Sequence, residues 1–301
     1  MVTIQKKHTY TGHKDAVYCI EQGVHHHEFY SAGGDGMVIQ WDLQNFENGR
    51  MIAKVPNSIY ALHVVKHKNL LIVGQNYEGI HIINLQDKSE LGSVKLSDAA
   101  IFDIKVCEDL IFVAGGKGEL SVVRLSTFEV LKRSSIAEGN LRSIHFTSLG
   151  KCLIGSSDGN IIQIDIGSLK IETEVRAHLT SVFALAQFDE EGLMLSAGRD
   201  ARLKYWQSDL LIEKESINAH MYAINDIVFR PDGKYFATAS MDKTIKIWDF
   251  EKRKLIKVID KARHQGHLTS VNKLCWTPHY DLLLSCSDDR SISVWQVDID
   301  E

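Results

Sequence analysis

Long hydrophobic runs, a secretory signal and an excess of positive charge are all missing from this sequence. No apolar run approaches the roughly 18 residues that a membrane-spanning helix needs, and residues 1–8 do not form the basic and then apolar segments of a secretory signal. Lys and Arg total 34 against 39 acidic residues, a formal charge of -5. Proteins that bind nucleic acid or anionic membranes carry the opposite sign of charge. We therefore expect a cytoplasmic protein with no membrane partner and no nucleic-acid partner.

Cysteine is also scarce. The five cysteines are odd in number and show no closely spaced pairs, so a disulfide framework is not indicated. Cys275 and Cys286 fall in neighbouring predicted strands, but a disulfide between them is disfavoured in the reducing setting that this cysteine usage indicates. We expect each cysteine to act as a small buried hydrophobic residue.

Motifs that carry catalysis or hold a cofactor are absent. The sequence has no Gly-Lys-Ser/Thr phosphate loop, no His-Glu-x-x-His and no Cys-x-x-Cys. Residues 33–36 (Gly-Gly-Asp-Gly) lie between two predicted strands, where glycines serve a hairpin. Residues 25–27 (His-His-His) could in principle bind a transition metal, but consecutive side chains point in different directions, and a solvated loop is favoured. We expect no enzyme, no metal and no cofactor.

What the sequence does contain is a β-rich unit, clearest in residues 219–249. Three short runs with strand character are separated by turns, of which Pro231-Asp232-Gly233 is typical of a tight turn. In the third run, Ile245 and Ile247 share one face while Trp248 lies on the other. A strand that is apolar on both faces belongs to a sheet packed between two others.

The unit recurs with a nearly constant period. Seven branched apolar residues open its first strand, namely Val17, Ile59, Ile101, Leu141, Val182, Ile224 and Val271. Seven positions end its third strand 22 to 24 residues later, namely Trp41, Ile83, Val123, Ile164, Trp206, Trp248 and Trp295. Seven copies of about 40 to 47 residues are typical of the blades of a propeller.

Four of the copies share a polar set with fixed spacing. A histidine precedes an aspartate by 22 residues, and a tryptophan follows that aspartate by 6. The sets are His13, Ser31, Asp35 and Trp41; His178, Ser196, Asp200 and Trp206; His220, Thr238, Asp242 and Trp248; and His267, Ser285, Asp289 and Trp295. With Gly12-His13, Gly266-His267, Trp41-Asp42 and Trp248-Asp249, the chain resembles the WD40-repeat family.

That resemblance implies a structural role for the four sets. In the family, a hydrogen-bonded chain from Trp to Ser/Thr to His to Asp joins the three inner strands of a blade. A Ser-His-Asp trio could also be read as a catalytic triad, but an active site needs one such arrangement and this chain repeats it four times. Copies two, three and four lack the histidine and the tryptophan, so spacing alone assigns them.

The fold class predicted is all-β: a single seven-bladed propeller domain, residues 1–301, with four-stranded antiparallel blades. The last copy ends at Glu301 just after its third strand, and Val2 to Tyr10 alternates like a strand. We therefore expect residues 2–10 to complete blade seven and close the ring, which removes an open sheet edge.

The predicted function is that of a non-catalytic, monomeric interaction scaffold that binds a peptide or protein segment. In the family resembled, partners dock on the face where the innermost strands enter the channel. Two sets of residues would lie there. The first set follows each opening position, and the second precedes the aspartate of each polar set (the tetrad aspartate) or the equivalent position in the other copies. From these two sets the predicted partner-binding residues are Tyr18, Tyr60, Phe102, Arg142, Phe183, Arg199, Asn225, Asn272 and Asp288.

Two alternatives stay open at this point. The aromatic residues of the first set could simply pack between blades, although Tyr, Phe and Arg also concentrate binding energy at interfaces. A metal-dependent propeller hydrolase with its site in the channel is the rival from another class, with Asn225, Asn272 and Asp288 as the polar groups near one arc.

Overall fold

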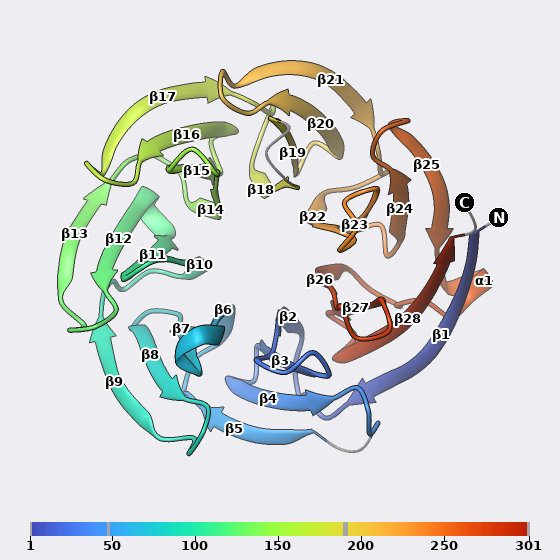
Figure 1. The fold of residues 1–301 in the computed structure, drawn as a ribbon, viewed down its shortest axis with the longest axis horizontal. Coiled ribbons are helices and arrows are strands. Elements are labelled where there is room, and N and C mark those ends of the chain that lie inside the picture. Colours follow the sequence, from blue (N-terminus) through green and yellow to red (C-terminus); the bar gives the residue numbers. More distant parts are fainter. Residues whose placement is uncertain (1, 47–48, 189–191, 300–301) are drawn as a thin grey trace.

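The protein is a ring of seven radial sheets around a central channel (Figure 1). The computed structural model describes residues 2–46, 49–188 and 192–299. Within these residues each sheet has four antiparallel strands, and the two ends of the chain lie side by side. The seven-bladed propeller predicted from the repeat is confirmed.

The strands of each blade run in chain order from the channel outward, except at the seam in blade seven. Blades one to four comprise β2 (Val17–Gln22), β3 (Glu28–Gly33), β4 (Met37–Asp42) and β5 (Arg50–Lys54); β6 (Ile59–Val65), β7 (Leu70–Gln75), β8 (Gly79–Asn84) and β9 (Glu90–Lys95); β10 (Ile101–Cys107), β11 (Leu110–Gly115), β12 (Glu119–Arg124) and β13 (Val130–Ser135); β14 (Leu141–Phe146), β15 (Lys151–Ser156), β16 (Asn160–Asp165) and β17 (Lys170–Arg176).

Blades five to seven comprise β18 (Val182–Gln187), β19 (Leu193–Gly198), β20 (Arg202–Gln207) and β21 (Ile212–Asn218); β22 (Ile224–Phe229), β23 (Tyr235–Ser240), β24 (Ile245–Asp249) and β25 (Lys254–Ile259); β26 (Val271–Trp276), β27 (Leu282–Ser287), β28 (Ser291–Ile299) and β1 (Val2–Thr11). Helical turns are short: η1 (Lys66–Lys68), η2 (Gly116–Gly118) and α1 (Lys261–His264). Across the described ranges, no helix is long and apolar enough to cross a membrane.

The N-terminal strand closes the ring as predicted. β1 pairs with β28 in antiparallel register from Val2 opposite Ile299 to Thr11 opposite Ser291. Tyr10 at its end is buried, and its hydroxyl donates a hydrogen bond to the carbonyl of Asp42 in blade one at 2.5 Å. The first strand of the chain therefore completes blade seven and also contacts blade one.

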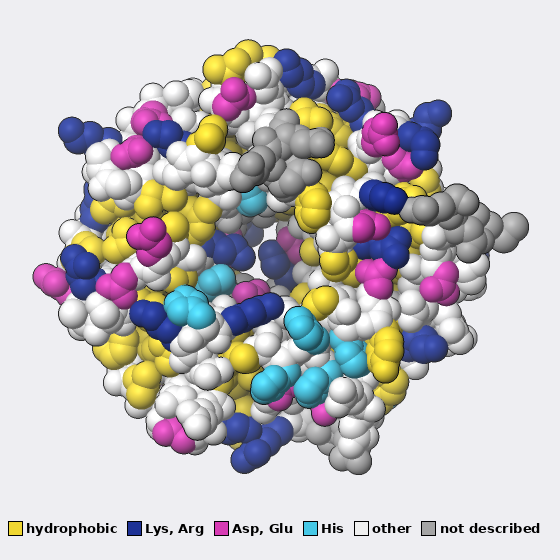
Figure 2. All heavy atoms as spheres, in the orientation of Figure 1, with side chains coloured by type: hydrophobic (Ala, Val, Ile, Leu, Met, Phe, Trp, Pro, Cys, Tyr) yellow, Lys and Arg dark blue, Asp and Glu magenta, His cyan; other side chains and the backbone are white. Residues whose placement is uncertain are grey.

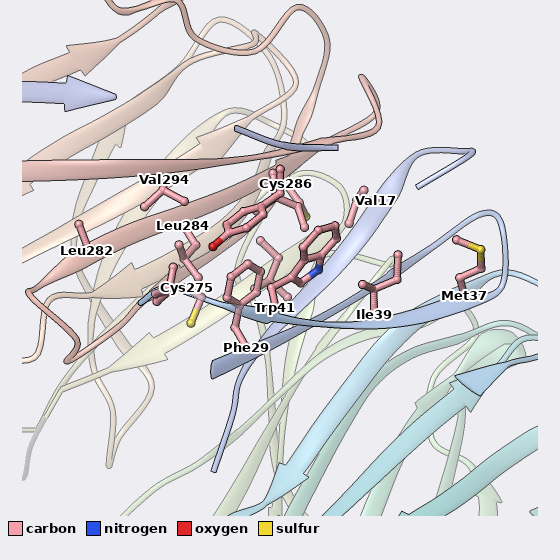
Figure 3. Close-up of a cluster of buried hydrophobic side chains, with 14 residues drawn as sticks. Val17, Phe29, Met37, Ile39, Trp41, Cys275, Leu282, Leu284, Cys286 and Val294 are labelled. Carbon is pink, nitrogen blue, oxygen red and sulfur yellow. The ribbon is translucent and has the colours of Figure 1, made fainter. Parts of the chain in front are cut away.

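The hydrophobic core is divided among the interfaces between blades. Seven clusters of buried apolar side chains occur among the described residues, one between each pair of neighbouring blades. At the seam, Trp41 and Phe29 of blade one pack with Leu284 of blade seven (Figure 3). Each blade is thus covered on both faces only because the ring is complete.

Blade six shows how the sequence pattern produces this arrangement. Trp248 lies in the cluster between blades five and six, whereas Ile245 and Ile247 lie in the cluster between blades six and seven. The two faces of β24 are therefore both buried, as its sequence predicts. All five cysteines are free thiols; four are buried and Cys107 is half-buried.

Candidate functional site

The four polar sets form hydrogen-bonded chains inside their blades. In blade six, Trp248 Nε1–H donates to Thr238 Oγ1 at 2.9 Å, and Thr238 Oγ1 lies 2.7 Å from His220 Nε2. The other ring nitrogen, His220 Nδ1, lies 2.8 Å from the carboxylate of Asp242. A neutral imidazole that accepts at Nε2 and donates from Nδ1 satisfies every contact in this chain.

The other three sets repeat this geometry. The distances from Trp Nε1 to Ser Oγ are 2.7 to 2.9 Å, and those from Ser Oγ to His Nε2 are 2.7 to 2.8 Å. Burial lowers the pKa of His220, although the hydrogen bond and charge of Asp242 partly oppose this shift. The pKa of Asp242 is depressed despite its burial, because His220 hydrogen-bonds to its carboxylate. Four equivalent hydrogen-bonded networks, one in each of four blades, therefore link the strands of their blade.

Blades two, three and four replace the hydrogen bond between tryptophan and serine with apolar contacts. The equivalent positions are ten residues apart and hold Val73 and Ile83 in blade two, Val113 and Val123 in blade three, and Ile154 and Ile164 in blade four. All six side chains are buried. Replacing both partners of a buried hydrogen bond with apolar groups is nearly neutral for stability, so these blades form without the motif.

The innermost strand of every blade carries a β-bulge at the same place. In each, the pairing with the second strand skips the residue that follows the opening apolar residue. A bulge turns the side chain away from the regular pleat and is common beside functional sites. The seven bulged residues are Tyr18, Tyr60, Phe102, Arg142, Phe183, Asn225 and Asn272, and all of them line the central cavity of about 900 Å³.

On one side of the channel these side chains form a continuous aromatic and cationic arc. The rings of Tyr18 and Tyr60 meet edge to face with centroids 4.8 Å apart, and Tyr60 stacks on Phe102 at 5.9 Å. The guanidinium carbon of Arg142 lies 3.9 Å from the ring centroid of Phe102 and 4.8 Å from that of Phe183. Five neighbouring blades therefore contribute to one connected surface.

The two asparagines continue the ring by bonding to the next blade. Asn225 Nδ2 donates to Val271 O at 2.8 Å and to Ser270 Oγ at 3.0 Å. Asn272 Nδ2 donates to Val17 O at 2.9 Å and to the carboxylate of Asp288 at 2.7 Å. All seven bulged side chains are half-buried, so they pack between blades and line the channel at the same time.

The residues that precede the tetrad aspartates, the second predicted set, differ in whether they line the cavity. Asp288 and Met241 line the cavity and are exposed. Asn76 is buried and bridges two blades, since its Oδ1 accepts the backbone N–H of Ile101 at 2.8 Å. Arg199 is exposed but is not among the residues that line the cavity. The structure therefore brings Asp288 together with the bulged residues, and Arg199 does not join them in lining the cavity.

Sequence reasoning missed an exposed apolar group on blades five to seven. Leu179, Met221 and Leu268 directly follow the tetrad histidines and are 74%, 83% and 58% exposed. Each donates its backbone N–H to the tetrad aspartate of its own blade at 3.1 to 3.2 Å. Their loops lead into the innermost strands, beside the exposed Tyr222 and Met241. The signal available in the sequence was an apolar residue after three of the four histidines.

Comparisons with known proteins agree with this geometry. The family described as WD domain, G-beta repeat matches residues 4–42, 213–249 and 259–296. The crystal structure of the WD40 β-propeller domain of Doa1 superposes with a TM-score of 0.87, covering 98% of this chain and 97% of that one at 16% identity. The chain is a WD40-repeat β-propeller.

Curated relatives of this WD40-repeat protein match only part of it. Polyadenylation factor subunit 2 of Candida albicans is 27% identical over 139 residues, 46% of this chain and 25% of that protein. Protein HIR1 of Cryptococcus neoformans is 24% identical over 198 residues, 56% of this chain and 22% of that protein. LEC14B protein of Lithospermum erythrorhizon is 31% identical over 116 residues, 36% of this chain and 24% of that protein. The chain thus spans about a quarter of the length of these relatives.

The rival hydrolase reading gains no support from the WD40 ring. The amide nitrogens of Asn225 and Asn272 already bond to neighbouring groups, as described above. Across residues 2–46, 49–188 and 192–299, no group of three or more His, Cys, Asp or Glu side chains is placed to hold a metal ion. In the loop that holds His25 and His27, the centroids of these two rings lie 5.7 Å apart in a stacked arrangement.

The far end of the channel differs in character from the bulged ring. Figure 2 shows an opening at the centre of the molecule, with histidine, lysine and arginine side chains around it on the face in view. Residues of the cavity wall there include Lys66, Lys105 and His145, which lie toward the ends of the innermost strands or just beyond them. Glu21 lines the same part of the cavity, so this end of the channel carries charged residues of both signs, whereas the aromatic arc lies at the other end.

Proposed function

We propose that this propeller is a non-catalytic interaction scaffold that binds an extended segment of a partner protein. The segment would lie across the channel mouth on the face where the innermost strands begin. The observation that carries the proposal is the repeated bulge, which turns seven side chains, four of them aromatic and one Arg142, into a single cavity. Tyr, Phe and Arg are enriched among the residues that dominate binding energy at interfaces.

The apolar group beside the mouth supports an extended ligand rather than a small one. Leu179, Met221, Tyr222, Met241 and Leu268 are more than half exposed and lie on three consecutive blades. Exposed apolar patches next to a polar cavity mark sites of protein association. A segment of several residues would place one side chain in the cavity and rest others on this patch.

The relatives support the same class of function. One of them is by name a subunit of a polyadenylation factor, and a subunit acts within an assembly. Propellers serve many unrelated processes, so the fold does not identify the partner. We propose in addition that residues 1–301 act as one domain and as a monomer, which size-exclusion chromatography with light scattering would test.

The test is a peptide selection that compares the two ends of the channel. A random peptide library is selected on the wild-type protein, and the selected peptides are synthesised and their affinities measured. The variant Tyr18→Ala/Tyr60→Ala/Phe102→Ala should bind them more than about 100-fold more weakly, since aromatic residues of this kind contribute roughly 2 kcal/mol or more each.

The matched control removes three exposed apolar side chains from the opposite end. Leu149, Leu210 and Tyr280 are 67%, 59% and 76% exposed in the turns at the far ends of their strands. The variant Leu149→Ala/Leu210→Ala/Tyr280→Ala should bind the peptides like wild type. Thermal melting establishes that both variants are folded. Equal binding by the mouth variant, or a selection that yields no binder, contradicts the proposed function.

A further inference from the structure

Arg142 is a cation in the channel wall without a counter-ion. Its side chain makes no hydrogen bond and no ion pair with any residue in the part of the chain that the structure describes. Burial lowers the pKa of Arg142 to about 10, a shift that the nearby Tyr60 phenol partly opposes, so the guanidinium stays charged at neutral pH. A half-buried charge without a partner is unfavourable, and attraction to aromatic faces offsets only part of that.

The aromatic faces of the arc are already covered, and this argues against a cationic guest. Phe102 has Tyr60 stacked on it at 5.9 Å, and the guanidinium of Arg142 lies over its ring at 3.9 Å. The same guanidinium lies over Phe183 at 4.8 Å. A lysine or arginine of a partner would have to displace Arg142 from these rings or lie beside its positive charge. The fixed cation therefore makes this side of the mouth repel positive charge.

Hydrogen-bond donors gather at the same place. A guanidinium carries five N–H donors in a planar fork that matches a carboxylate or a phosphate. The hydroxyls of Tyr18 and Tyr60 make no hydrogen bond within the described ranges, and both residues line the cavity. The guanidinium of Arg142 and the phenols of Tyr18 and Tyr60 together supply several hydrogen-bond donors, and no acceptor among the described residues bonds to them.

Acidic groups lie on the other side of the mouth. The pKa of Tyr18 is raised by burial and then by the neighbouring Tyr60, Asp288 and Asp15. The carboxylate of Asp288 is fixed by Asn272 at 2.7 Å. The mouth thus has the cation of Arg142 at blade four and the carboxylates of Asp288 and Asp15 at blades seven and one. An anionic group would be attracted to the first and repelled by the second.

We infer that Arg142 is a subsite for an anionic oxygen group, a carboxylate or a phosphate, presented by the bound peptide. The inference rests on the proposed function and adds the chemistry of the residue that enters the channel. The anion would accept N–H donors from Arg142 with the Tyr60 hydroxyl beside it. The rest of the segment would then extend over the apolar group on blades five to seven.

The peptides selected on the wild-type protein provide the test. They should share an acidic residue or a free C-terminal carboxylate, and three synthetic versions distinguish the source of the charge: Glu replaced by Gln, Glu replaced by phosphoserine, and an amidated C-terminus. Arg142→Met should weaken binding of the acidic peptide about 10- to 100-fold, as expected for loss of a charge-assisted hydrogen-bonded pair. Arg50→Met, which removes an exposed arginine of the outer strand β5, away from the channel mouth, should leave the affinity unchanged.

A double-mutant cycle separates a direct contact from an effect on folding. The neutral peptide should lose as much affinity for wild type as Arg142→Met loses for the acidic peptide, and the two changes together should cost little more than either alone. Arg142→Glu should reverse the preference of the selection toward basic peptides. If Arg142→Met proves unstable in thermal melting, the affinities of the acidic and neutral peptides for wild type still show whether the anionic group contributes to binding.

The outcomes distinguish this inference from the proposed function. Selected peptides without an anionic group, or equal affinity of the acidic and neutral peptides for wild type, overturn the anion subsite. The proposed function then stands, provided that the Tyr18→Ala/Tyr60→Ala/Phe102→Ala variant still loses binding. If that triple variant binds like wild type, the proposed function itself fails.

Discussion

The carboxylate of Asp226 in blade six lies 2.8 Å from the ammonium nitrogen of Lys273 in blade seven. Its other oxygen accepts the backbone N–H of Leu274 at 2.9 Å, and Asp226 is almost fully buried. Asp103 makes a similar bridge from blade three, accepting the N–H of Ile144 in blade four at 2.7 Å. Carboxylates in the channel wall thus link neighbouring blades by hydrogen bonds between their innermost strands.

Removing the Asp226 carboxylate should destabilise the ring strongly. Burial opposes the charge of Lys273, but the attraction of Asp226 and other carboxylates holds its pKa above the usual value. Asp226→Ala removes the ion pair with Lys273, whose side chain is 38% exposed, and the acceptor for the N–H of Leu274, so the free energy of unfolding should fall by about 1 to 3 kcal/mol. Urea unfolding measures the change.

Two further variants control this prediction. Asp226→Asn keeps an acceptor for the N–H of Leu274 and should lose less stability than Asp226→Ala. Asp226→Ala/Lys273→Met removes both charges and should recover part of the loss. An Asp226→Ala protein with the unfolding midpoint of wild type would show that the bridge contributes nothing.

Deleting β1 should open the ring at the seam. Without residues 2–11, the outer edge of β28 has no partner strand and the cluster at the seam loses Tyr10. An unpaired strand edge promotes association with other chains. We expect a lower melting temperature together with oligomers or aggregates in light scattering. A monomeric deletion variant with unchanged melting would contradict this closure.

A milder variant tests the contact of Tyr10 alone. Tyr10→Phe keeps the ring among Phe29 and Trp41 but removes the hydroxyl that bonds to the carbonyl of Asp42. The expected loss is about 0.5 to 1.5 kcal/mol. Because the sheet pairing is intact, this variant should stay monomeric.

The sequence predicted the ring because its signals are local and repeated. Alternation around Trp248 indicates a strand buried on both faces, and the recurrence of the opening apolar residue every 40 to 47 residues counts the blades. The bulge at Tyr18 is not visible in this way, since it depends on the register between β2 and β3. The bridge from Asp226 to Lys273 joins residues 47 positions apart on different blades, and no local pattern indicates it.

The candidate site shows the same limit. The sequence places Arg142 near the channel mouth, but its lack of a counter-ion depends on what every neighbouring blade presents. Arg199 and Asp288 occupy equivalent positions in the repeat, yet Asp288 lines the cavity and Arg199 does not. Exposure of Leu179 and Met221 depends on the tetrad aspartates that hold their backbone, and only the folded blade shows this. Whether these residues bind a partner stays a prediction.

Acid should destabilise the protein, and protonation of His145 should contribute to the pH range over which stability is lost. Burial, followed by the charge of Lys105, lowers the pKa of His145 to about 4, although Asp103 opposes the shift. The unfolded chain therefore binds this proton more readily than the folded one. The stability present above pH of about 6.5 is lost as pH falls toward 4, by up to about 3 kcal/mol.

The measurement is urea unfolding at several pH values for wild type and His145→Asn. Burial also lowers the pKa values of His13 and His220, so both proteins should lose stability in acid. The variant should have the shallower profile between pH of about 6.5 and 4. His25→Asn, in an exposed loop, is the matched control. Parallel profiles for wild type and His145→Asn would refute the assignment.

Met221 offers the sharpest separation of binding from folding. Its side chain is 83% exposed, while its backbone N–H is held by Asp242 at 3.1 Å. A substitution of the side chain leaves that hydrogen bond in place, and changes at such exposed positions alter stability by roughly 0.5 kcal/mol or less. Met221→Glu should therefore melt like wild type. If a partner segment rests on the apolar group of blades five to seven, the new charge should weaken binding of the selected peptides about 10-fold or more, since an apolar contact is lost and a carboxylate is desolvated.

Leu149→Glu makes the same kind of change at the opposite end of the channel, where Leu149 is 67% exposed, and should bind the peptides normally. Equal affinities of the two glutamate variants would remove this apolar group from the binding surface and confine the contact to the channel itself.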